Sequence, residues 1–282
     1  MPELPEVETI CRALRNGGRD APAIIDWQIE RAEVFWDKTL ADPTQEEFIH
    51  RVVGQRVLDV SRRAKFIVIR MSSDFLIVHL RMSGDLRVEP NSHALQKHDH
   101  LVVWFQNDYH MAFNDPRKFG RVWLKDDIGK LFGRLGPEPL ELESSEDFYQ
   151  RLYQRKRQLK PLLMDQNFLS GMGNIYTDEA LHIAGLHPLM NSSDMTRSDA
   201  QKLLLAIQNV LKIGIQRNGA SIDWFYRGGS FQNEFRVYGK SGQACPICGT
   251  LIEKIVVGQR GTHFCPVCQP IPRSFRIKEK EG

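Results

Sequence analysis

Short runs of β-branched and aromatic residues, separated by turn-forming residues, dominate the chain between residues 56 and 124. The runs cover residues 56–60, 65–71, 75–80, 101–106 and 109–114. Serine, asparagine and aspartate at 72–74 and 107–108 supply turn chemistry between neighbouring runs. Such spacing favours an antiparallel sandwich or barrel over a parallel sheet. The pattern therefore predicts a β-rich N-terminal half.

The hydrophobic spacing becomes helical after Pro137 and Pro139, which mark a linker. Residues 146–217 predict several helices, of which 198–217 is the clearest. Thr196 and Asp199 stand where a capping box would begin this helix. Its apolar residues recur at helical spacing and form one stripe, which consists of Leu203, Leu204, Ile207, Val210, Leu211 and Ile215. Strands followed by helices predict an α+β protein.

Composition narrows the classes of protein that this chain can belong to. Its 282 residues, 41% of them hydrophobic, are enough for two domains. The net charge of +3 is only mildly basic, so any binding to nucleic acid must depend on local clusters. The N-terminus lacks a secretory signal, and the longest apolar runs are far shorter than the roughly 20 residues that cross a bilayer. We expect a cytosolic protein without a membrane span.

Four of the five cysteines form two closely spaced pairs near the C-terminus. They are Cys245 and Cys248, then, after 16 residues, Cys265 and Cys268. In a cytosolic protein this spacing indicates a metal rather than disulfides. Four thiolates complete the tetrahedral shell of Zn²⁺ and leave no position for substrate. One structural zinc ion is therefore predicted.

The remaining cysteine and the segment between the pairs have separate interpretations. Cys11 is spaced at helical intervals with Val7, Ile10 and Leu14, which predicts a buried thiol without a function. The β-branched run with glycines 258 and 261 predicts a hairpin that presents Arg260 at or near its tip. That arginine suits phosphate binding, but a solvated surface arginine fits the spacing equally well.

The N-terminus combines a candidate nucleophile with carboxylates. If the initiator methionine is removed, Pro2 offers a secondary amine that titrates near pH 8, and its neutral fraction can attack a sugar carbon or an aldehyde. Glu3 would then lie beside this amine as a general acid or base. Pro5 and the neighbouring glutamates also resemble an ordinary helix start. The residues alone favour that simpler interpretation.

Both ends of the chain, with several ordered internal segments, resemble the formamidopyrimidine-DNA glycosylase family. The resemblance covers nearly the whole chain. The matching segments are PELPEVET at 2–9, RRAKF at 62–66, HLRMSG at 79–84, KHDH at 97–100, NDPRKFG at 114–120, LMDQ at 163–166, GNIY at 173–176, FQNE at 231–234 and GTHFC at 261–265, together with the four-cysteine finger.

The resemblance implies a bifunctional glycosylase and abasic-site lyase of base excision repair. Such an enzyme removes oxidised purines, namely 8-oxoguanine and formamidopyrimidines, and then breaks the strand by β and δ elimination. By similarity, Pro2 forms the Schiff base with the deoxyribose and Glu3 donates its proton. Lys65 would donate the proton for β elimination and Arg260 the one for δ elimination. The residues expected at the lesion pocket are Glu6, Ser221 and Trp224.

The family also implies how the enzyme handles DNA. Extruding a base leaves a hole in the duplex, and Met82, Arg117 and Phe119 match the residues that fill it. Without the flanking motifs, Met82 and Phe119 would be interpreted as core residues, and the basic residues 151–160 as a solvated helix face. The residues expected to contact DNA are His98, Arg117, Lys156, Lys160 and Asn174.

The implied architecture divides the chain into four parts. Residues 1–135 would form a catalytic antiparallel β-sandwich domain with flanking helices, and 136–232 a helix-two-turns-helix domain. Residues 233–269 would form the zinc finger, and 270–282 a disordered tail. The expected partner is double-stranded DNA with oxidised bases or abasic sites, bound by a monomer in the cytoplasm of a bacterium, at its nucleoid.

Two alternatives remain open. An endonuclease VIII-like enzyme shares the fold but prefers oxidised pyrimidines, and it is expected to begin Pro-Glu-Gly-Pro where this chain has Pro-Glu-Leu-Pro. A zinc-finger protein that binds DNA without catalysis would need no free N-terminus. The loop between Ser221 and Phe231 is shorter than usual in the family and carries three consecutive aromatic residues, which leaves the base preference undecided.

Overall fold

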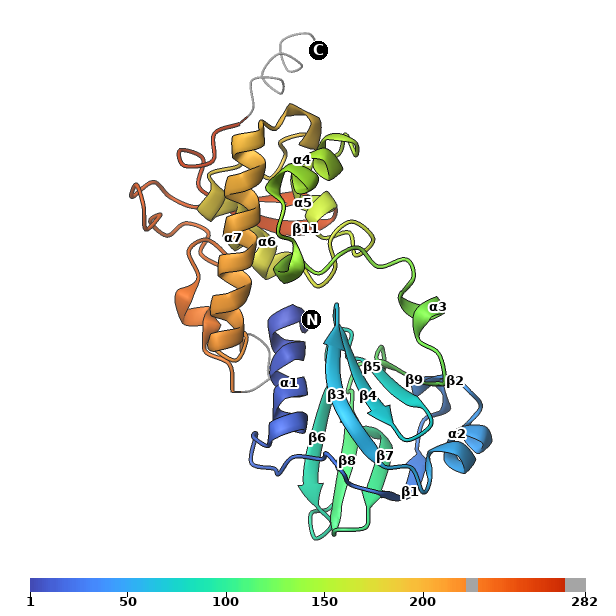
Figure 1. Cartoon of the computed structure of the whole chain (residues 1–282). Coiled ribbons are helices and arrows are strands. Elements are labelled where there is room, and N and C mark those ends of the chain that lie inside the picture. The colour runs from blue at the N-terminus through green and yellow to red at the C-terminus, as the bar shows by residue number, and fades with distance from the viewer. Residues whose placement is uncertain (222–227, 272–282) are drawn as a thin grey trace. The chain divides into compact units, whose positions relative to one another are not determined.

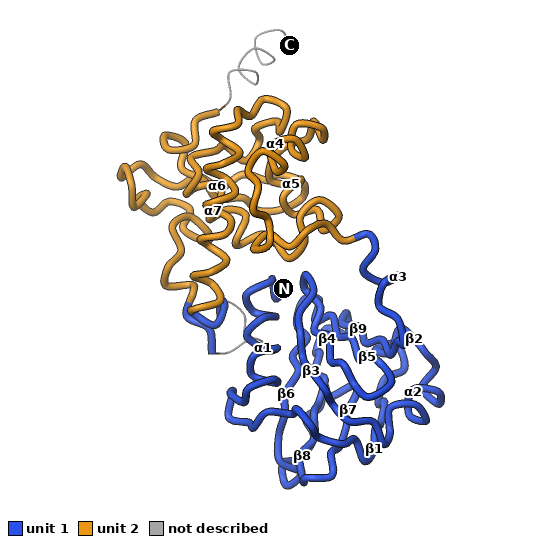
Figure 2. The backbone as a smooth tube through the Cα atoms, in the orientation of Figure 1, with its two compact units in different colours: residues 1–134, 217–230 blue, residues 135–216, 231–282 orange. Residues whose placement is uncertain are grey.

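The computed structural model describes residues 1–221 and 228–271 and divides the chain into two compact units. Unit 1 comprises residues 1–134 and 217–230, and unit 2 comprises residues 135–216 and 231–282 (Figure 2). Trp224 and the tail from residue 272 onward lie outside the described residues.

Unit 1 begins with helix α1, Leu4–Asn16. Pro5 lies in its first turn, where a missing N–H costs nothing. Leu4, Val7, Ile10 and Leu14 recur on its buried face, which packs on strands β3, Val57–Arg63, and β4, Phe66–Met71 (Figure 1). Cys11 is 0% exposed on this face, and burial raises the pKa of its thiol to about 12. The predicted burial of this thiol in the core is confirmed.

Two sheets form the body of unit 1. One has the order β1-β7-β8-β6, with bounds Ile29–Val34, Asp99–Phe105, Tyr109–Asn114 and Asp85–Pro90. The other has the order β2-β9-β5-β4-β3, in which β2 is Leu40–Asp42, β9 is Arg121–Lys125 and β5 is Phe75–His79. The five predicted runs correspond to β3, β4, β5, β7 and β8.

The sheets contain four strands that the hydrophobic runs did not predict. In β1, β6 and β9 the buried residues are separated by half-buried or exposed ones, so these strands contain no long apolar run. The three-residue β2 pairs parallel with β9, whereas the other paired strands in the described ranges are antiparallel. The antiparallel prediction is therefore correct for the sandwich, with one parallel pair at its edge.

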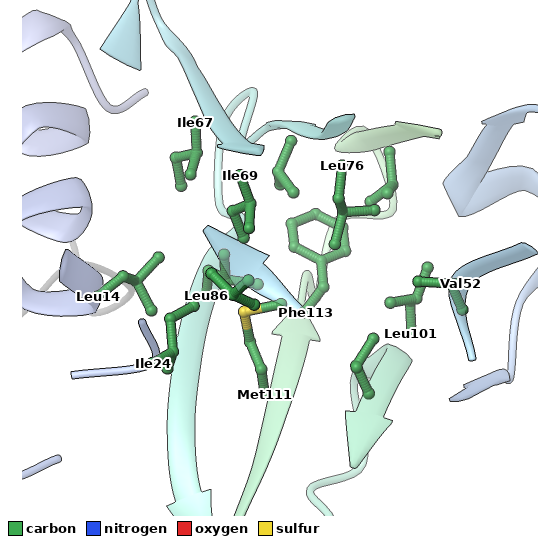
Figure 3. Packing of buried hydrophobic residues seen from close by; sticks show 14 of the residues in the cluster. Leu14, Ile24, Val52, Ile67, Ile69, Leu76, Leu86, Leu101, Met111 and Phe113 are labelled. Carbon is green, nitrogen blue, oxygen red and sulfur yellow. The ribbon is translucent and has the colours of Figure 1, made fainter. Parts of the chain in front are cut away.

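A single hydrophobic core lies between the two sheets. Ile69 and Leu76 from one sheet and Leu101 and Phe113 from the other belong to the same cluster (Figure 3). The cluster also includes Val52 from helix α2, Gln45–Val52. The short helix α3, Gly129–Phe132, follows the last strand.

Unit 2 is helical. Its helices are α4, Ser145–Tyr153, α5, Leu159–Leu163, α6, Asn174–Ala184, and α7, Arg197–Gln216. The predicted capping box begins α7: the hydroxyl of Thr196 accepts from the backbone N–H of Asp199 at 3.1 Å, and the carboxylate of Asp199 accepts from that of Thr196 at 3.0 Å. Helix α6 is buried from Ile175 to His182, which explains why its sequence carries no amphipathic pattern.

The C-terminal part of unit 2 carries the predicted hairpin. Strands β10, Glu253–Val257, and β11, Arg260–Phe264, pair antiparallel, with Val257 opposite Arg260 beside the turn. Arg260 therefore lies next to the tip, as predicted. Within the described ranges, no helix is long and apolar enough to cross a membrane.

Candidate active site and nucleic-acid interface

The start of α1 concentrates two buried carboxylates beside the predicted nucleophile. Pro2 is buried, and Glu3 and Glu6 are 2% and 3% exposed. The backbone N–H of Glu3 donates to Oε2 of Glu6 at 2.8 Å, so the Glu6 carboxylate caps the helix. The positive end of the helix dipole favours a negative charge at this position. The resemblance to a helix start is thus real, and it does not exclude a chemical role.

The second oxygen of Glu6 holds the segment that leads to Ser221. Its Oε1 accepts from the backbone N–H of Ala220 at 2.7 Å. Gly219 has a φ of +77°, and a Cβ at this residue would lie 2.6 Å from Oε1 of Glu6. Only glycine tolerates this combination of backbone angle and close approach. Glu6 therefore fixes residues 219–221 against the start of α1.

Lys65 lies in the turn between β3 and β4 and is only 4% exposed. The turn is tight, because Ala64 has a φ of +53°. Burial lowers the pKa of the nearby His79 to about 3, and the charges of Arg81 and Lys65 contribute to this shift. The structure thus places Lys65 on a strand pair that packs against α1.

Met82, Arg117 and Phe119 lie on two loops of unit 1. Met82 is half-buried in the turn after β5. Arg117 is exposed, and its guanidinium carbon lies 5.0 Å from the ring centroid of Phe119. Phe119 is 50% exposed, so the interpretation of this residue as part of the core is wrong. His98 is half-buried just before β7.

Lys160, which the resemblance places among the residues that contact DNA, is buried in this structure. Its side chain is 0% exposed, and its ammonium lies 2.5 Å from Oδ1 of Asp178, which is also 0% exposed. The ammonium also donates to the carbonyl of Gly261 at 3.1 Å. The other oxygen of Asp178 accepts from the backbone N–H of His263 at 2.9 Å. Lys160 therefore holds the Arg260 hairpin to α6 and offers no charge to solvent.

The other residues expected at phosphates are differently placed. Lys156 and Arg260 are exposed, and Lys156 adopts a left-handed φ of +46° between α4 and α5. Asn174 is the first residue of α6, and its Nδ2 donates to the carbonyl of Gly261 at 3.1 Å. Its Oδ1 is buried and has no hydrogen-bond partner among the described residues.

Sequence patterns missed Asp178 and Glu179, two adjacent buried acids of α6. Glu179 accepts from the backbone N–H groups of Arg236, Val237 and Tyr238 at 2.8–3.0 Å. Despite these bonds, burial raises the pKa of Glu179. Consecutive acids within an otherwise apolar helix are the only signal that could have marked them.

The four clustered cysteines fit a zinc ion. Their sulfur atoms all lie within 4.8 Å of one another, with Cys245 and Cys268 at 3.8 Å and Cys248 and Cys265 at 3.4 Å. A tetrahedral shell with Zn–S bonds of about 2.3 Å places sulfurs roughly 3.8 Å apart. Nε2 of the buried His182 lies 3.4 Å from the sulfur of Cys245. These four thiolates would hold the ion, which stabilises the finger.

Three family models match successive parts of the chain. They describe the formamidopyrimidine-DNA glycosylase N-terminal domain at residues 1–122, the formamidopyrimidine-DNA glycosylase H2TH domain at 135–225, and a zinc finger found in FPG and IleRS at 242–271. Together they cover most of the sequence.

Relatives and solved structures agree with these matches. The chain is 41% identical over 279 residues to a formamidopyrimidine-DNA glycosylase of Protochlamydia amoebophila, covering 95% of this chain and 99% of the relative. It is 38% identical to the protein of that name from Haemophilus influenzae, with 95% and 99% covered. A Lactococcus lactis FPG variant, in complex with a Fapy-dG containing DNA, superposes with a TM-score of 0.88 at 35% identity over 96% of this chain and 100% of that one.

Proposed function

The chain belongs to the formamidopyrimidine-DNA glycosylase family, and we propose that it acts as a DNA glycosylase and abasic-site lyase of base excision repair. Its substrates would be duplexes that contain 8-oxoguanine, formamidopyrimidines or abasic sites. The name shared by the relatives argues against a silent zinc-finger protein. We also propose that it works as a monomer in the bacterial cytoplasm, at the nucleoid, since its substrate is chromosomal DNA.

The observation that carries this proposal is the buried pair of carboxylates at the start of α1. After removal of Met1, which is 40% exposed, the amine of Pro2 would begin the chain directly before Glu3. The amine would attack the anomeric carbon, the glycosidic bond would break with the damaged base as the leaving group, and opening of the sugar ring would leave a Schiff base. Glu3 would donate the proton that the sugar takes up as the Schiff base forms. Glu6 would hold residues 219–221, and with them Ser221 of the expected lesion pocket, in place.

The remaining assignments rest on the family resemblance. Lys65 and Arg260 would donate the protons for β and δ elimination. Met82, Arg117 and Phe119 would enter the hole that the extruded base leaves. His98, Arg117, Lys156 and Asn174 would contact phosphates, whereas the buried Lys160 would act by holding the Arg260 hairpin. Residues 1–135, 136–232 and 233–269 would serve as the catalytic, helix-two-turns-helix and zinc-finger domains.

Borohydride trapping tests the proposed nucleophile, because only a Schiff base is reduced to a stable enzyme–DNA bond. The expected result is a covalent complex with lesion DNA, weakened by Pro2→Gly and abolished by an N-terminal tag. Arg12→Ala, an exposed change on the same helix, is the matched control. Undiminished trapping with the tagged chain would move the nucleophile elsewhere, most plausibly to Lys65.

A substrate panel separates the proposed purine preference from the endonuclease VIII-like alternative. Duplexes that differ only in the lesion are compared at one salt concentration, since DNA affinity depends on salt. Faster removal of oxidised pyrimidines than of formamidopyrimidine and 8-oxoguanine would contradict the purine assignment while leaving the glycosylase class intact.

A further inference from the structure

A buried hydrogen bond joins the loop that carries Met82 to the loop that carries Arg117 and Phe119. The hydroxyl of Ser83 donates to Oδ1 of Asp115. Ser83 is 2% exposed and Asp115 is 0% exposed. The first loop links β5 to β6 and the second links β8 to β9, so each crosses from one sheet to the other. The strands that bound the loops pair, with Asp85 opposite Asn114 and His79 opposite Arg121, so the hydrogen bond joins two loops whose ends already lie side by side.

Asp115 also organises its own loop. Oδ1 accepts from the backbone N–H of Arg117 at 3.2 Å, and Oδ2 accepts from that of Gly120 at 2.6 Å. Its carbonyl accepts from the N–H of Lys118 at 3.1 Å and lies 2.9 Å from Nε2 of His100. These hydrogen bonds replace the contacts with water that the buried carboxylate has lost.

The base of this loop also rests directly on the core. A Cβ at Gly120 would lie 2.3 Å from Cζ of Phe113 and 3.1 Å from Oδ2 of Asp115. Phe113 belongs to the cluster between the sheets. The Met82 loop is closed in turn by a hydrogen bond from the N–H of Gly84 to the carbonyl of Leu80 at 2.9 Å. The base of each loop is therefore closely packed, so that neither base can shift while its neighbours stay in place.

We propose that the Ser83–Asp115 hydrogen bond makes the two loops one rigid inserting device, so that Met82 enters the duplex together with Arg117 and Phe119. Ser83 and Asp115 are positioning residues, which touch neither the lesion nor the sugar. Separating the loops would strand the Asp115 carboxylate without its hydroxyl donor, at a cost typical of a buried charged hydrogen bond. The proposal rests on the proposed function of the void-filling residues.

The first experiment compares one lesion in two settings under single-turnover conditions. In one duplex the lesion is paired, and in the other the opposite nucleotide is absent, so no helix must be invaded. Ser83→Ala should slow excision from the paired duplex by about 10-fold, the loss expected from one charged hydrogen bond, and change excision opposite the gap by less than about 2-fold. Ser73→Ala, an exposed serine on the turn between β4 and β5, is the matched control.

Conservative variants separate positioning from folding. Ser83→Thr keeps the hydroxyl and should recover most of the paired-duplex rate, while thermal unfolding monitors the fold of each variant. Equal losses on both substrates, or no loss on the paired duplex, would overturn the proposal. If the wild-type chain excised no lesion from either substrate, the proposed function itself would fail instead.

A second measurement does not depend on the buried residues tolerating substitution. Met82→Ala and Phe119→Ala change half-buried and exposed side chains, so the fold should survive both. If the loops insert as one device, the two changes should be strongly non-additive for the paired duplex, because the first already disables joint insertion. Independent, additive effects would refute the coupling.

Discussion

Replacing Lys160 by methionine tests the ion pair at the centre of unit 2. The change removes a positive charge and two hydrogen bonds but keeps a side chain of similar length. It leaves Asp178, at 0% exposure, with only the backbone N–H and the ring Nδ1 of His263 as partners among the described residues, at 2.9 and 3.3 Å. Breaking a buried pair by removing one partner typically costs 3–5 kcal/mol, so we expect a loss of about 3–5 kcal/mol in the stability of unit 2.

Two further variants serve as controls for the size of this loss of stability. Combining Lys160→Met with Asp178→Asn removes both charges and keeps an acceptor for His263, so the loss should fall to about 1–3 kcal/mol. Arg157 and Asp165 form an ion pair at 2.7 Å in the same unit, but their side chains are 46% and 29% exposed. Arg157→Met should therefore cost less than about 1 kcal/mol.

The distribution of tryptophan allows the two units to be followed separately. All five tryptophans, Trp27, Trp36, Trp104, Trp123 and Trp224, fall within the residue ranges of unit 1. Urea unfolding monitored by tryptophan fluorescence therefore reports unit 1, and far-ultraviolet circular dichroism is dominated by the helices of unit 2. Lys160→Met should shift the second transition more than the first. A shift no larger than that of Arg157→Met would refute the reasoning.

Three further predictions concern other parts of the chain. Chelation or Cys248→Ser should abolish DNA binding, measured at matched salt, yet leave the fluorescence transition of unit 1 unchanged; equal binding with and without zinc would contradict this. Burial lowers the pKa of His79 to about 3, below its unfolded value near 6.5, so its contribution to stability is complete above pH ~6.5 and declines as the pH falls towards 3. By urea titration, the wild type should lose roughly 2 kcal/mol more than His79→Asn between pH ~6.5 and ~4.5, and parallel curves would exclude the effect. Trp224→Ala should slow excision of every lesion by similar factors and spare preformed abasic sites, if its ring stacks over the extruded base; loss on 8-oxoguanine alone would contradict stacking.

Local features of the sequence were enough to predict much of the fold. The hydrophobic runs located β3, β4, β5, β7 and β8, because continuous apolar runs mark strands that are buried in the sandwich. The Thr196–Asp199 capping box located the start of α7, since its hydrogen bonds join residues three apart. Cysteine spacing was enough for the metal cluster, because each ligand pair lies within one short turn.

Features that depend on distant residues could not be derived in this way. The spacing of Lys160 predicted an exposed charge in a basic cluster, and only the fold shows that it is buried against Asp178. Oε1 of Glu6 meets the N–H of Ala220, which is 214 residues away. The hydroxyl of Ser83 donates to Asp115, which is 32 residues away.

The sequence by itself thus determined five of the strands, the clearest helix, the metal ligands and the family of this protein, because propensity, periodicity, capping and ligand spacing act over a few residues. The tertiary structure alone decided which polar groups are buried and what each one binds. Burial and partner choice depend on chain segments that fold together from distant positions, and no local pattern encodes them.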